Sequence, residues 1–210
     1  MMRGLFINFE GIDGSGKTGQ IERLHERMLS EGMSVIVTRE PGGPPLAEEI
    51  RTVALRKRPQ KVLPITELLL FYAARNENYH TLILPAINQQ INVISDRFSP
   101  SSVAYQVAGR GMKPEIVRAV DDIVLDGATP DITIVLDIDM MTSNARISNR
   151  GEGDRLDEAG PEFRDRVRGS YLEQAANDPE HFFVVNAMGS PDDVHEIIYN
   201  KVSSMLRENH

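Results

Sequence analysis

Five short apolar runs recur along the chain, and stretches with helical spacing lie between them. Each run indicates a strand buried in a sheet, because it is short and mostly apolar. The runs are Leu5–Phe9, Val35–Val37, Ile91 with Val93 and Ile94, Ile132–Leu136, and Phe182–Val185. Strands that alternate with helices predict an α/β fold, here a three-layer α/β/α domain with a five-stranded parallel sheet.

Two of the intervening helices show a clear apolar face. The first follows the first strand and is predicted to place four apolar side chains on one side, namely Ile21, Leu24, Met28 and Leu29. The second runs from about Pro191 to Arg207, and we interpret it as structural. Its predicted buried stripe consists of Val194, Ile197, Ile198, Val202 and Met205.

The stretch from Asn149 to Pro161 interrupts this pattern. It is rich in glycine, acidic residues and arginine and poor in apolar residues, which is typical of a mobile loop between two helices. We therefore expect a single domain over residues 1–210, with a short mobile lid at about 146–161.

The residues between the first strand and the first helix carry the pattern Gly-x-x-x-x-Gly-Lys-Thr. In this strand, loop and helix context the pattern predicts a phosphate-binding loop, or P-loop. Its glycines let backbone N–H groups point at an anion, and the helix adds its positive N-terminal end. Lys17 is expected to reach the outer phosphates and the Thr18 hydroxyl to ligate Mg²⁺. The predicted nucleotide-binding residues are Gly11, Ile12, Asp13, Gly14, Ser15, Gly16, Lys17 and Thr18.

Composition narrows the function further. The formal net charge is −8, which argues against a general affinity for nucleic acid or membranes. The chain has no cysteine, so disulfides, thiolate metal sites and cysteine nucleophiles are excluded. The first strand begins close to the N-terminus, and no apolar stretch approaches membrane-spanning length. We therefore expect no signal peptide and a cytoplasmic location.

Charged residues follow several of the strands, and in such sheets binding sites lie at the carboxyl ends of the strands. Asp96 and Arg97 follow the third strand. Beside a P-loop, the aspartate would hold the water shell of Mg²⁺, and the arginine would bridge the two phosphates being joined. The alternative is a plain salt bridge at the end of a strand.

Two further groups of residues suggest a site for a base and a sugar. Phe71 and Arg75 lie four residues apart on a predicted helix, so that an aromatic plate and a forked donor share one face. Ser102, Tyr105 and Gln106 follow the Asp96–Arg97 pair and offer a hydroxyl, a phenol and an amide. The alternatives are a core phenylalanine with a surface arginine, and an ordinary serine-capped helix N-terminus.

The predicted lid contains Arg146, Arg150 and Arg155. Phosphoryl transfer needs positive charge where negative charge develops, and a closing loop can supply it. Gly14 brings no charge within the P-loop, so the lid is the expected source of a catalytic arginine. The alternative is a solvated, charged loop.

Taken together, these residues resemble thymidylate kinase over nearly the whole chain. The resemblance rests on Phe9–Thr18, Thr38–Gly43, Leu70–Arg75, Asp96–Phe98 with Ala104–Gln106, and Arg150–Arg155. It implies the reaction ATP + dTMP → ADP + dTDP with Mg²⁺, in the layout that carries its catalytic arginine in the lid. The family is usually homodimeric, and we expect the same here.

The resemblance also implies roles for individual residues. Lys17, Arg97, Arg150 and Arg155 form the expected catalytic set, and Thr18 and Asp96 are the expected Mg²⁺ residues, partly through water. The residues expected to bind dTMP are Asp13, Arg39, Arg51, Phe71, Arg75, Arg97, Ser102, Tyr105 and Gln106. Two other functions stay open: another nucleoside monophosphate or deoxynucleoside kinase, and a nucleotide-binding switch without catalysis.

Overall fold

A computed structural model describes residues 3–148 and 160–208 of the chain. Five parallel strands form one sheet in the order β2-β3-β1-β4-β5. The strands are β1 (Phe6–Glu10), β2 (Val35–Arg39), β3 (Asn92–Asp96), β4 (Ile132–Asp137) and β5 (Phe182–Asn186). The predicted α/β fold and its five strands are confirmed. Each strand continues past its apolar run into polar residues, and these carry side chains to the carboxyl edge of the sheet.

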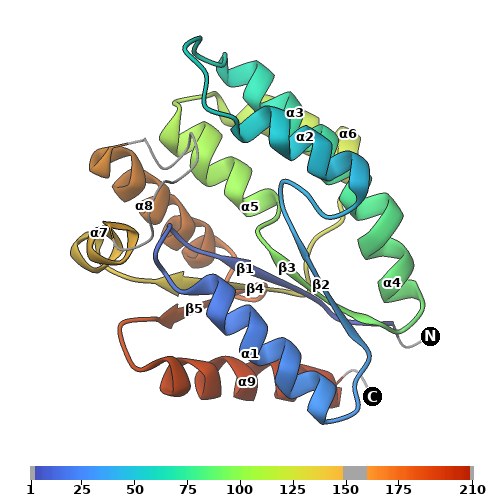
Figure 1. Cartoon of the computed structure of the whole chain (residues 1–210). Coiled ribbons are helices and arrows are strands. Elements are labelled where there is room, and N and C mark those ends of the chain that lie inside the picture. The colour runs from blue at the N-terminus through green and yellow to red at the C-terminus, as the bar shows by residue number, and fades with distance from the viewer. Residues whose placement is uncertain (1–2, 149–159, 209–210) are drawn as a thin grey trace.

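Helices cover both faces of the sheet (Figure 1). One face packs against α1 (Lys17–Ser30) and α9 (Pro191–Glu208), which also contact each other. The other face packs against α4 (Leu84–Asn88) and α8 (Pro161–Asn177). All five side chains of the central strand β1 are buried, because helices lie on both sides of it.

Further helices lie outside this second layer, where α2 and α3 stand at the top of the view in Figure 1 with α6 behind them. They are α2 (Pro45–Leu55), α3 (Pro64–Asn78) and α6 (Pro114–Leu125). A π-helical segment, η1 (Tyr79–Ile83), continues α3 into α4, and a second one, η2 (Val103–Gly109), continues the short α5 (Ser99–Ser102). One further helix, α7 (Met140–Ser148), follows β4.

The buried faces of α1 and α9 differ in part from the predicted stripes. Leu29 and Ile197 were expected to be buried, but they are 48% and 47% exposed. The buried faces also include residues outside the predicted stripes, such as His195 and Tyr199 on α9. On α1 the buried face includes Gln20, whose amide donates a 2.9 Å hydrogen bond to the Pro191 carbonyl at the start of α9. A polar residue at the start of α1 thus takes part in the contact with α9, which the apolar pattern did not indicate.

Two features bear on the sequence predictions for the lid and the membrane. Within the predicted lid, residues 146–148 end α7 and Pro161 begins α8, while 149–159 lie outside the described residues. Over the residues that the structure describes, no helix has the length and apolar character needed to span a membrane.

Candidate active site

A cavity of about 250 Å³ opens at the carboxyl edge of the sheet, beside β1, β2 and β3. Its walls come from the P-loop, the segment after β2, α3, and the segment from Asp96 to Gln106. The predicted site residues that line it are Asp13, Gly14, Gly16, Lys17, Thr18, Arg51, Phe71, Arg75, Asp96, Arg97, Ser102, Tyr105 and Gln106. Segments far apart in the sequence therefore meet in one place, as expected for the strand ends of a parallel sheet.

The P-loop joins β1 to α1 in a conformation that requires glycine. Gly11 and Gly14 have φ angles of 141° and 80°, in the region that disfavours side chains. A Cβ atom at Gly11 would lie 2.6 Å from the Leu136 carbonyl oxygen, and one at Gly14 would lie 3.0 Å from that of Ser143. Helix α1 begins at Lys17 and has no acidic residue in its first turn. Its positive N-terminal end is therefore available to an anion.

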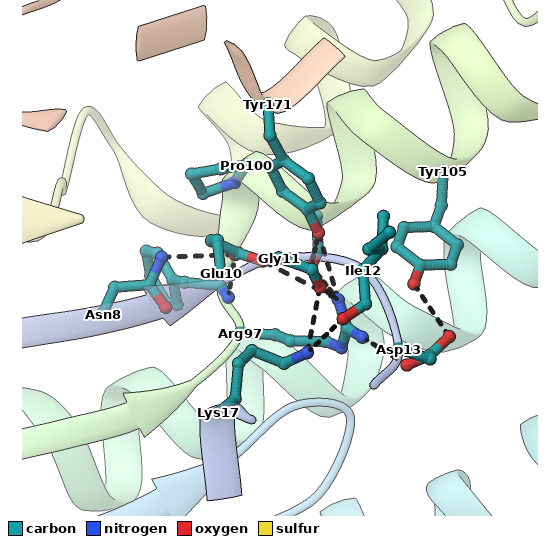
Figure 2. A network of polar contacts seen from close by, with 12 residues as sticks. Asn8, Glu10, Gly11, Ile12, Asp13, Lys17, Arg97, Pro100, Tyr105 and Tyr171 are labelled. Carbon is teal, nitrogen blue, oxygen red and sulfur yellow. Dashed lines mark hydrogen bonds and ion pairs between the residues drawn. The ribbon is translucent and has the colours of Figure 1, made fainter. Parts of the chain in front are cut away.

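Lys17 is buried beneath this loop. Its Nζ donates hydrogen bonds to the carbonyl oxygens of Gly11 at 2.9 Å and Ile12 at 3.3 Å (Figure 2). Burial, aided by the nearby charge of Arg97, lowers the pKa of the Lys17 amine to about 8. An anion beside this amine would favour its charged form, which is the form that a phosphate attracts.

Arg97 leaves the end of β3 with a φ of 76°, in the left-handed region that residues other than glycine rarely adopt. Its Nη2 donates to Asp13 at 2.9 Å, and its Nη1 donates to the Gly11 carbonyl at 3.2 Å (Figure 2). The guanidinium thus lies directly under the P-loop and lines the cavity. This placement is more specific than a plain strand-end salt bridge, because the pair joins β3 to the phosphate-binding segment.

Phe71 and Arg75 line the same cavity from α3. Arg75 is only 3% exposed, so the alternative of a surface arginine is wrong. Its Nε donates to Glu40 at 2.6 Å, Nη1 to Ser102 at 2.9 Å and Nη2 to the Phe98 carbonyl at 3.0 Å. These contacts hold the guanidinium rigidly in the wall of the cavity.

Two of the polar residues after Asp96 lie against carboxylate partners. The Gln106 amide donates to Glu67 at 3.0 Å, and the Tyr105 hydroxyl lies 3.5 Å from Asp13. The alternative of serine caps does not hold, since α5 has no side-chain capping bond at its N-terminus. The segment instead presents Ser102, Tyr105 and Gln106 to the cavity.

The arginines predicted to bind phosphate lie in different places. Arg51 lines the cavity and donates to the Pro41 carbonyl at 2.6 Å. Arg39 forms a bidentate pair with Glu48, is largely exposed and does not line the cavity. Arg150 and Arg155 lie outside the described residues. The roles expected of all four stay predictions.

A second cavity, of about 350 Å³, adjoins the first at Gly16. It lies between α1, α7 and the segment that follows β5. Arg146, at the start of the predicted lid, lines this cavity and donates to the carbonyl oxygens of Gly14 at 3.1 Å and Ala187 at 3.4 Å. The end of α7 is thereby fixed to the P-loop between the two cavities.

Thr18 and Asp96, the two residues expected to hold Mg²⁺, offer oxygen atoms but no complete set of metal ligands. Thr18 and Asp96 line the main cavity, and the Asp96 Oδ1 atom is buried without a hydrogen-bond partner among the described residues. Within that same part of the chain no cluster of three or more acidic or histidine side chains forms a metal cage. A carboxylate and a hydroxyl suit Mg²⁺, which keeps several waters and takes further oxygens from substrate phosphates.

Four buried residues of the site were missed by the sequence reasoning: Glu10, Glu40, Glu67 and Tyr171. Glu10 is the last residue of β1, and Glu40 directly follows β2. An acidic residue at the end of an apolar strand is unusual, and this position could have marked both as site residues. Glu67 and Tyr171 lie in helices whose pattern gave no indication of their partners.

Known proteins of one family are similar to this chain. The family model described as thymidylate kinase matches residues 9–198. A thymidylate kinase of Halothermothrix orenii is 43% identical over 98% of this chain and 99% of its own, and one of Hahella chejuensis is 39% identical over 98% and 99%. The crystal structure of thymidylate kinase from Ehrlichia chaffeensis superposes with a TM-score of 0.77 at 34% identity, covering 95% of this chain and 99% of that one.

Proposed function

Because the chain belongs to the thymidylate kinase family, we propose that it transfers a phosphoryl group from ATP to dTMP, giving ADP and dTDP. One observation carries the proposal. Phe71 and Arg75 on α3 line the same cavity as the P-loop and Arg97, which supports a site for a base beside a site for phosphates. A switch would need the P-loop but not the wall from α3.

In this proposal each residue of the site contacts the base, the sugar or a phosphate of the two nucleotides. Phe71 stacks on the thymine, and Arg75 donates to a base carbonyl, with Ser102 and Gln106 completing the contacts to the base. Tyr105 lies against the sugar, and Asp13 meets the sugar or the metal shell. Arg97 and Arg51, with Arg39, hold the acceptor phosphate, while Lys17 holds the outer phosphates of the donor. The acceptor is already an anion, so positioning and charge neutralisation carry the catalysis.

We place Mg²⁺ next to Thr18 and Asp96. When bound, it would neutralise charge on the phosphate oxygens. The Thr18 hydroxyl and, through water, the Asp96 carboxylate would hold the ion. The donor's base would occupy the second cavity, since that cavity meets the P-loop at Gly16. Arg150 and Arg155 would supply lid charge at the transferred group. The cytoplasmic location stays a prediction.

A panel of acceptors tests the function directly. We expect kcat/KM to be highest for dTMP when the purified chain is given ATP and Mg²⁺ with dTMP, dUMP, CMP or AMP, and ADP release is measured. A preference for CMP, AMP or dUMP would replace dTMP as the substrate. Slow ATP hydrolysis that no acceptor accelerates would favour the switch instead.

We also infer a homodimer, formed through the helices outside the second layer. Large exposed apolar side chains lie on α2, α3 and α6, which contact one another in the order α2, α3, α6. They are Leu46, Val53, Ile65, Leu69, Ile116 and Ile123, together with Leu63 just before α3. Exposed apolar residues gathered on adjacent helices are typical of an interaction surface.

The variant Ile123→Glu is expected to convert the dimer into monomers, because Ile123 is 83% exposed and a charge there would be buried in the interface. The measurement is molar mass by light scattering or sedimentation. The matched control is Leu29→Glu, which places the same charge on a half-exposed site of α1. A monomeric wild type, or a dimer that survives Ile123→Glu unchanged, would contradict this surface.

A further inference from the structure

Tyr171 is a buried phenol with no role in the mechanism above. It comes from α8, on the far side of the sheet from α1, and is 1% exposed. Its hydroxyl oxygen lies 3.1 Å from the Nη1 atom of Arg97 (Figure 2). The same oxygen lies 2.8 Å from the Oγ atom of Ser101. It therefore touches the arginine to which the proposed function gives the acceptor phosphate.

The directions of these hydrogen bonds follow from counting hydrogens. Ser101 has one hydroxyl hydrogen, which it donates to the Glu10 carboxylate at 2.7 Å. Ser101 must therefore accept from the Tyr171 hydroxyl, and the Tyr171 oxygen accepts from Arg97. Burial, together with the charge of Glu10, holds the pKa of Tyr171 well above its usual range, so the phenol keeps its hydrogen.

These hydrogen bonds fix the Nη1 side of the Arg97 guanidinium. Nη1 donates toward Tyr171, Ser101 and the Gly11 carbonyl, and Nη2 gives one hydrogen to Asp13. Among the described residues, Nε has no protein acceptor. Nε–H and one of the two Nη2 hydrogens lie on the same edge of the planar group, with the spacing that two phosphate oxygens require.

We propose that Tyr171 is a positioning residue that ties the Nη1 side of Arg97 to the protein and so leaves the Nε–Nη2 edge open to the acceptor phosphate. The inference rests on the proposed function. Without the phenol oxygen, Nη1 loses one acceptor, and the guanidinium can turn a different edge toward the cavity. The acceptor phosphate is then held less precisely for in-line transfer.

The test is Tyr171→Phe, which removes a single oxygen. We expect kcat with dTMP to fall about tenfold or more, as for loss of a hydrogen bond to a charged group, with a smaller change in the KM for ATP. The matched control is Tyr199→Phe, since Tyr199 is also buried and hydrogen-bonded, to Glu31, but lies on α9 away from the cavity. We expect this control to leave kcat within twofold of wild type.

A double-mutant cycle separates positioning from a merely structural role. In an Arg97→Lys background the planar fork is gone, so Tyr171→Phe should cause little further loss of kcat. An equal loss in both backgrounds, or a folded Tyr171→Phe variant with wild-type kcat, would overturn the inference. If Tyr171→Phe does not fold, Ser101→Ala removes the acceptor of the Tyr171 hydroxyl and must show the same dependence on Arg97. A wild-type chain that does not phosphorylate dTMP would refute the proposed function instead.

Discussion

Lys17→Ala is expected to lower kcat about a thousandfold while the protein stays folded. The amine is a positive group placed beneath the P-loop, where charge builds up on the transferred phosphoryl group. Among the described residues its hydrogen-bond acceptors are two carbonyl oxygens, so within that part of the chain its loss removes no ion pair. Burial already disfavours the charged amine, as its pKa of about 8 indicates. The measurements are steady-state turnover with dTMP and the free energy of unfolding, which should change by about 1 kcal/mol or less.

The pH dependence of ATP affinity provides a second test of the role of the Lys17 amine. Phosphate binding needs the protonated amine, and the free protein holds it with a pKa of about 8. Affinity for ATP should therefore be full below pH 8 and fall by up to about tenfold per pH unit above it, until the higher pKa of the bound amine is reached. In Lys17→Ala this decline should vanish. Near-wild-type turnover in that variant, or an unchanged pH profile, would contradict the role of Lys17.

The sheet could be predicted because buried parallel strands require apolar side chains on both faces, and short apolar runs between polar segments are typical of such strands. The ends of the strands were less predictable. Asp96 and Asn186 belong to strands by their backbone pairing, which their side chains do not signal. The faces of α1 and α9 depend on how the two helices pack against each other, and in that packing Gln20 is buried while Leu29 is exposed.

Site residues could be predicted where backbone geometry limits the sequence. The P-loop needs glycines at φ angles closed to other residues, so its pattern is visible along the chain. The residues that hold the site residues in place could not be predicted in this way, because they are distant from them in the sequence. Glu40 and Arg75 are 35 residues apart, and Arg97 and Tyr171 are 74 apart. Such pairs form only when the whole sheet and its helices are assembled, and no local spacing encodes them.

Arg75→Leu is expected to lower the free energy of unfolding by about 3–5 kcal/mol, because it leaves the Glu40 carboxylate buried without its cation. The two side chains are each 3% exposed and meet at 2.6 Å. Burial already raises the pKa of Glu40, and the positive charge of Arg75 opposes that shift. Without Arg75 the carboxyl should take up a proton or unfold the wall of the cavity. A chain of this size should then melt about 10 °C lower.

The exposed pair one residue earlier in the chain provides a matched control. Arg39 meets Glu48 in a bidentate pair of the same chemistry but is 54% exposed, so Arg39→Leu should cost about 1 kcal/mol or less. The double variant Glu40→Leu with Arg75→Leu should recover part of the loss, since it removes the unpaired charge but leaves the partners Asn78 and Ser102 unsatisfied. If Arg75→Leu proved no more costly than Arg39→Leu, burial would not govern this pair. The rigidity of the cavity wall would then have to come from contacts that do not involve the Arg75 guanidinium.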